Sequence, residues 1–320
     1  MQPDVLGQKS TFLNQDKSVV KTGAQNKLTT DQYTKFLNAK ILCQNDEWAL
    51  ARVLIYDLLN QMPKHPEFLN LIASQSKQLT LVEQLRIFQE LALQNPTFDT
   101  SYNLAQFYYT QGEDELALGQ FMDTLMYESD DIIKKFEVYK SLGNIYVRTK
   151  KFDNAQECFE KALVLNKYSD AISINMGTLA IQRNDLNSSL YYYREAVKVN
   201  PRNDKAWVGL ALSHNQMGDF HLAKANLENA IEINPVNKTA LILLANWTVQ
   251  DKTSLSTCGY LENYLSLVEE FDSEISLILI QIFCENEKWA MAKLEIERNL
   301  LWQPLNENSL ILEREIQKYI

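Results

Sequence analysis

Glycine and proline are scarce in this chain of 320 residues, which contains only 9 glycines and 7 prolines. β-sandwiches and β-barrels need many tight turns, and glycine and proline are prominent among the residues that form them. The composition therefore argues against those folds and favours long helices with short connections. Apolar residues make up 46% of the chain, which is enough for a sizeable core and excludes disorder of the whole chain.

The chain also lacks an excess of basic residues. It has 31 Lys and Arg against 41 Asp and Glu, so the formal net charge is −10. Proteins that bind nucleic acid neutralise phosphates with cationic side chains, and we therefore expect no nucleic-acid partner. No stretch approaches 18 apolar residues without a charge, so we expect no direct insertion into a membrane.

Cysteine and histidine are few and scattered. The four cysteines show no C-x-x-C spacing, and the three histidines have no cysteine or carboxylate cluster at the spacing of metal ligands. We therefore predict free thiols, no metal site and no cofactor. Residues 1–30 contain no apolar run typical of a signal peptide, and together with free thiols this predicts a cytoplasmic location.

Prolines reveal a repeat. Five of them are separated by distances close to whole multiples of a period of about 34 residues. The successive gaps correspond to one, three, one and two periods. These five are Pro63, Pro96, Pro201, Pro235 and Pro304. The same period relates residues in the middle of the chain, such as Leu142, Met176 and Leu210. Self-similarity of this kind is typical of stacked helical repeats.

Two apolar stripes make up each unit. Tyr139, Leu142 and Tyr146 recur at spacings of three and four, as on one face of a helix, and a similar stripe begins at Phe152 after a short polar break. Gly143 is small where the two helices must approach closely. Such a pair buries one face and leaves another exposed, so we expect neighbouring units to stack.

These residues resemble the tetratricopeptide repeat family, whose pattern is W-x-x-L-G-x-x-Y, then A-x-x-x-F, then P. The match is close at Leu142, Gly143, Tyr146, Ala155 and Phe159. Eight units are predicted to start near Gln32, His65, Phe98, Phe136, Asp170, Asp204, Lys238 and Ser273. The resemblance implies an all-α fold, a right-handed α-solenoid superhelix of about eight helix-turn-helix repeats.

Three regions are predicted along the chain. Residues 1–30 are polar with little periodicity and are expected to form a flexible extension. The repeats are expected to occupy residues 31–304. Residues 305–320 resemble one more amphipathic helix, which we interpret as the cap that a terminal repeat needs for solubility.

The resemblance also implies that the first helix of each unit faces a concave groove. The predicted lining residues are Tyr102, Asn103, Gln106, Tyr109, Lys140, Asn144, Arg148, Asn175, Thr178, Gln182, Lys205 and Asn215. Amides can pair with a peptide backbone and cations with its charges. The sequence therefore predicts a groove for an extended or acidic peptide segment of a partner protein.

Four of these residues resemble part of the carboxylate clamp of tetratricopeptide co-chaperones. Lys140, Asn144, Asn175 and Lys205 match four of its five positions, where ammonium and amide groups converge on a C-terminal carboxylate. The fifth position should be basic and is Gly209 here. A clamp for the C-terminus of a chaperone is therefore one of the alternatives.

The leading hypothesis for function is a non-catalytic scaffold or adaptor that binds a partner segment in its groove. A structural subunit that packs, or self-associates, through its ends or convex face is the other alternative, and the oligomeric state stays open. An enzyme is not expected, because the sequence contains no G-x-x-x-x-G-K-[ST], G-x-G-x-x-G, G-x-S-x-G or H-E-x-x-H motif.

Overall fold

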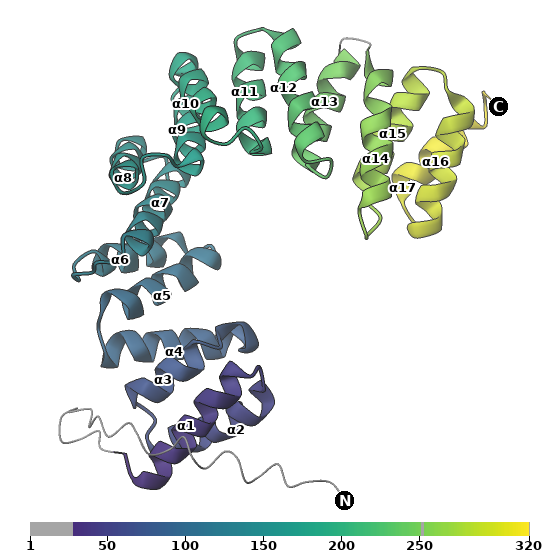
Figure 1. Ribbon diagram of the computed structural model, residues 1–320. Coiled ribbons are helices and arrows are strands. Elements are labelled where there is room, and N and C mark those ends of the chain that lie inside the picture. The colour runs from purple at the N-terminus through teal and green to yellow at the C-terminus, as the bar shows by residue number, and fades with distance from the viewer. Residues whose placement is uncertain (1–27, 251–252, 320) are drawn as a thin grey trace, which may run out of the picture. The chain divides into compact units, whose positions relative to one another are not determined.

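The computed structural model describes residues 28–250 and 253–319, and every regular element in these ranges is helical (Figure 1). The prediction of an all-α fold is therefore confirmed. Almost all of the predicted N-terminal extension lies outside the described residues. The helices form two compact units, Met1–Glu128 and Ser129–Ile320.

Six α-helices make up the first unit within its described part. They are α1 (Thr30–Gln44), α2 (Trp48–Gln61), α3 (Pro66–Ala73), α4 (Leu81–Gln94), α5 (Phe98–Thr110) and α6 (Asp114–Thr124). The second helix pair is unusual because α3 has only eight residues and is followed by a short 3₁₀ turn, Ser76–Gln78.

Eleven α-helices make up the described part of the second unit. They are α7 (Ile132–Arg148), α8 (Phe152–Leu165), α9 (Asp170–Gln182), α10 (Leu186–Val199), α11 (Asp204–Gln216), α12 (Phe220–Ile233), α13 (Lys238–Gln250), α14 (Cys258–Leu267), α15 (Ser273–Glu285), α16 (Trp289–Trp302) and α17 (Glu307–Ile316). Successive helices pack as pairs, as a solenoid of helical hairpins requires (Figure 1).

A single left-handed residue makes the turn in several hairpins. Lys150, Asn184 and Gly218 have φ values of 57°, 60° and 82°, and they occupy the same position between the two helices of three consecutive pairs. Only one of these three is glycine, although the left-handed region favours glycine. The turns therefore form with few glycines, in agreement with the composition.

Close helix approach within a pair depends on a small residue opposite an aromatic ring. Gly143 of α7 is buried, and a Cβ added there would overlap the ring of Phe159 on α8. Ala155 and Phe159 are fully buried in the same pair. The small residue predicted at the crossing therefore makes room for the large one.

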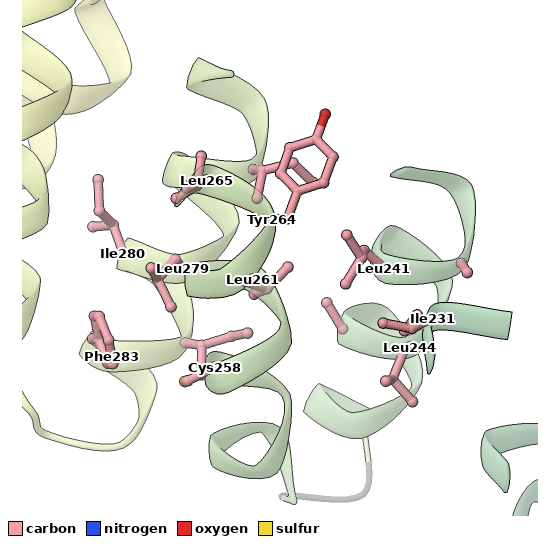
Figure 2. Packing of buried hydrophobic residues seen from close by; sticks show 14 of the residues in the cluster. Ile231, Leu241, Leu244, Cys258, Leu261, Tyr264, Leu265, Leu279, Ile280 and Phe283 are labelled. Carbon is pink, nitrogen blue, oxygen red and sulfur yellow. The ribbon is translucent and has the colours of Figure 1, made fainter. Parts of the chain in front are cut away.

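Contacts between consecutive pairs build the core of the second unit. Figure 2 shows Leu261 and Cys258 of α14 between Leu244 of α13 and Leu279 of α15. The side chains of Leu261, Leu244 and Leu279 are all at most 1% exposed. Leu261 of α14 therefore packs against α13 of its own pair and against α15 of the next pair.

Polar contacts also link one pair to the next at the start of α9, α11, α13 and α15. Asp170, the first residue of α9, accepts hydrogen bonds of 2.8 Å from Asn200 and from Asn203 in the following linker. Burial acts to raise the pKa of Asp170, but these hydrogen bonds outweigh it and lower the pKa. The same arrangement recurs one repeat later around Asp204, whose partners are Asn234 and Asn237.

The polarity of this contact reverses in the seventh pair. Lys238, the first residue of α13, forms ion pairs of 2.7 Å with Asp272 and Glu274 of the following linker and helix. At the start of α15 the corresponding residue is Ser273, whose hydroxyl accepts a hydrogen bond from Asn306 at 3.0 Å. In each case the first residue of the helix contacts residues about one repeat further along the chain, but the chemical type of the contact differs.

Glu83 stabilises the start of α4 in the first unit. It accepts hydrogen bonds from the Tyr56 hydroxyl at 2.7 Å and from the backbone and hydroxyl of Thr80 at 3.0 and 2.8 Å. These hydrogen bonds, and the nearby Arg52, lower the pKa of Glu83 to about 2. Since the pKa is lowered in the folded state, the stabilisation is present above the ordinary value and is lost as the pH falls towards 2.

We predict that Glu83→Gln will lower the free energy of unfolding at neutral pH, because it removes the charge while glutamine keeps the helix-capping geometry. The difference from the wild type should shrink as the pH is lowered from 6 to about 2. Chemical denaturation followed by circular dichroism at a series of pH values measures it. Glu115→Gln, at an exposed position of α6, is the matched control and should have a smaller effect. A constant difference across this pH range would contradict the prediction.

Candidate partner-binding surface

The predicted lining residues of the first unit lie on α5. Tyr102 and Tyr109 are half-buried, and their ring centroids lie 6.5 and 6.2 Å from that of Phe121, which is fully buried on α6. Both tyrosines therefore contribute to the core of their helix pair. Gln106 is half-buried, and its Oε1 is buried and accepts no hydrogen bond within the described residues. Asn103 is exposed.

Two predicted residues of the second unit are in direct contact. The Asn175 side chain on α9 donates a hydrogen bond of 2.8 Å to Oδ1 of Asn144 on α7. This contact aligns the polar stripes of two consecutive first helices. Each amide therefore uses part of its hydrogen-bonding capacity on the other. This pairing could not be predicted from the sequence, because the two asparagines lie on separate helices.

Lys140 is largely occupied by its own helix. Its ammonium lies 2.6 and 2.7 Å from the carboxylate oxygens of Glu137 and 5.7 Å from the ring centroid of Phe136. Its side chain is 26% exposed, so the ion pair is at the surface and contributes little to stability. The ion pair does reduce the positive charge that Lys140 offers to a ligand.

The other predicted residues differ in exposure. The Thr178 hydroxyl donates to the carbonyl of Ile174 at 3.0 Å and lies 3.0 Å from the Tyr193 hydroxyl, so it takes part in contacts within its repeat. Asn215 is half-buried, and its Oδ1 accepts no hydrogen bond in the described part of the chain. The exposed members are Arg148, Gln182 and Lys205.

Gly209, at the fifth position of the predicted clamp, is a packing residue. It is buried on α11, and a Cβ added there would overlap the ring of Tyr193. That ring is 3% exposed and also lies 2.9 Å from the Cβ position of Gly177, so it cannot move aside. A basic side chain therefore does not fit at position 209, which accounts for the incomplete clamp.

Titratable clusters suited to metal binding were not found among the described residues. In the same ranges, no helix combines the length and apolarity needed to cross a bilayer. All four cysteines lie within these ranges and are free thiols.

Family sequence patterns decide the identity of the repeats. The tetratricopeptide repeat pattern matches residues 136–169, 174–219 and 204–237 in three separate models of the family. The chain is a tetratricopeptide repeat protein. Proteins of this family generally mediate protein–protein interactions and are usually non-catalytic.

Solved structures agree with this tetratricopeptide repeat fold. The type IV pilus biogenesis factor PilW is 23% identical, with a TM-score of 0.52, and the match covers 68% of this chain and 99% of PilW. Human IFIT1, in a dimer with PPP-AAAA, is 13% identical, with a TM-score of 0.58 and coverage of 90% and 72%. Comparison with curated proteins found no match. At these identities the similarity concerns the fold alone.

We predict that Gly209→Ala will destabilise the tetratricopeptide repeats by about 1–3 kcal/mol, because the added methyl group overpacks the contact with Tyr193. The matched control is Gly259→Ala, at an exposed helical position with no atom within 4 Å of the added Cβ. It should leave stability unchanged or raise it by up to about 1 kcal/mol. Urea denaturation measures both, and equal midpoints for the two variants would contradict the packing role of Gly209.

Proposed function

We propose that this protein is a non-catalytic scaffold whose central repeats bind an extended, acidic segment of a partner protein. The observation that carries the proposal is the contact between Asn144 and Asn175, which joins the polar stripes of α7 and α9. Lys140 lies on one of these stripes, one turn before Asn144. Lys205 is exposed at the start of α11, the next first helix.

Charge supports an acidic ligand. Residues 132–237 contain fourteen basic and eleven acidic residues, a net charge of +3, although the whole chain carries −10. An acidic segment is therefore attracted to the central repeats and repelled by much of the remaining chain. Lys205 offers an exposed cation, and a ligand carboxylate can compete with Glu137 for Lys140.

Amide side chains suit an extended backbone. Asn175 has two amide hydrogens and a carbonyl oxygen, and its hydrogen bond to Asn144 uses one of the hydrogens. Its other groups can pair with peptide N–H and C=O groups whatever the ligand sequence is. We place the protein in the cytoplasm, which the four free thiols support.

The chaperone-clamp alternative has less support, because a basic side chain cannot stand at position 209 without displacing Tyr193. Packing through the ends or the convex face inside a larger assembly is the alternative that the binding experiment must separate. Binding on the central first helices predicts a dependence on Lys140 and Lys205, whereas packing through other surfaces does not.

The test uses the double variant Lys140→Glu with Lys205→Glu and a short fluorescent peptide rich in glutamate. We expect the variant to bind the peptide at least about tenfold more weakly than the wild type, because two attractive charges become repulsive. Fluorescence anisotropy measures the affinity, and added salt should weaken binding to the wild type.

The matched control is Lys161→Glu with Lys198→Glu, which makes the same change in net charge on the second helices α8 and α10. Lys161 and Lys198 are exposed and each pairs with a glutamate of its own helix, as Lys140 does. An equal loss of affinity in both double variants, with unchanged melting curves, would contradict the proposed site.

A further inference from the structure

A hollow of about 690 Å³ lies near the C-terminal end of the second unit, between three helices. Its apolar lining comes from α13, α15 and α17, and we call it the C-terminal groove. The apolar residues that line it are Ile242, Leu277, Ile278, Ile311 and Leu312. Among the described residues, no basic side chain contributes to its lining. The groove therefore differs in character from the polar stripe of the central repeats.

The apolar residues of this groove are incompletely covered. Ile311 of α17 is 53% exposed, and Ile242, Leu277, Ile278 and Leu312 are half-buried. Apolar surface gains free energy when it is removed from water, and a concave apolar surface is typical of a binding site. An amphipathic helix presents the unbroken apolar stripe that such a groove can cover.

Carboxylates lie at one end of the groove. Gln281, which lines the groove, donates a hydrogen bond of 3.0 Å to Glu285 one turn further along α15. Glu315 lies one turn after Ile311 on α17, as Glu285 lies one turn after Gln281 on α15, so both carboxylates adjoin lining residues without lining the groove themselves. At the other end, Glu274 lines the groove and is paired with Lys238.

The surrounding sequence is strongly acidic. Residues 253–320 contain five basic and twelve acidic residues, a net charge of −7, in contrast to the +3 of residues 132–237. An acidic ligand is therefore repelled by the region of the C-terminal groove, and a basic ligand is attracted to it.

We propose that the C-terminal groove binds a basic amphipathic helix of a partner protein, with apolar side chains on Ile242, Leu277 and Ile311 and lysines or arginines facing Glu285 and Glu315. This site is separate from the one proposed on the central repeats and has the opposite charge preference. The scaffold thereby joins an acidic segment and a basic segment on one chain.

The probes are three synthetic fluorescent peptides. The first carries leucines at helical spacing with lysines on the opposite face, the second replaces the lysines by glutamates, and the third replaces the leucines by serines. We expect the full-length protein to bind the first peptide and to bind the other two at least about tenfold more weakly. Fluorescence anisotropy at fixed salt measures the three affinities.

Two groove variants test the location. Ile311→Ser should weaken binding of the first peptide at least about fivefold, because it removes apolar contact area. Leu294→Ser is its control, since Leu294 is 70% exposed on α16 and does not line the groove. Glu285→Gln with Glu315→Gln should also weaken binding, whereas Glu262→Gln with Glu297→Gln makes the same charge change at exposed positions of α14 and α16 and should not.

Several outcomes overturn the proposal. Equal losses in the groove variants and their controls would indicate unspecific attraction of a cationic peptide to an acidic protein. Equal binding of the lysine and glutamate peptides would remove the charge preference. Self-association that Ile311→Ser abolishes, without binding of the first peptide, would assign the groove to a second copy of the chain. None of these results depends on the acidic peptide that tests the central site.

Discussion

Each helical hairpin of this protein has two apolar faces and can bury only one of them by itself. The other face must be covered by the next hairpin, and Leu261 of α14, between α13 and α15, illustrates that contact (Figure 2). Stacking of this kind covers the sides of each pair, and both proposed sites lie on a stripe of the first helices that stacking leaves partly exposed.

Periodicity made the fold predictable from the sequence. A small residue opposite an aromatic ring, such as Gly143 with Phe159, recurs at Gly177 with Tyr193 because the two helices of each hairpin cross at the same position. The helices of the second unit follow the period that these residues predict. The pairing partners of polar residues were not predictable. Lys140 with Glu137 and Asn144 with Asn175 depend on rotamers and on the distance between successive helices, which a sequence pattern leaves open.

The C-terminal groove did leave a signal in the sequence. Ile242, Leu277 and Ile311 follow one another at about one repeat length on the first helices, and the same column holds Lys140, Ile174 and Val208 in the central repeats. The concentration of acidic residues after residue 253 was equally visible. The predicted lining residues do not include this column, because a sequence pattern does not distinguish a partly exposed apolar column from a buried one. In the structure these residues line the hollow between α13, α15 and α17.

The reversal of polarity at Lys238 has a consequence for how this chain can evolve. The hairpins that begin with Asp170 and Asp204 are followed by the same amide pair, so either can be duplicated or exchanged without disturbing its neighbour. The hairpin that begins with Lys238 needs the carboxylates of Asp272 and Glu274 after it. A linker of the amide type in that place would replace the two ion pairs of Lys238 by hydrogen bonds to neutral amide oxygens. The Asp170 and Asp204 hairpins are therefore equivalent at this contact, and the Lys238 hairpin is not equivalent to them.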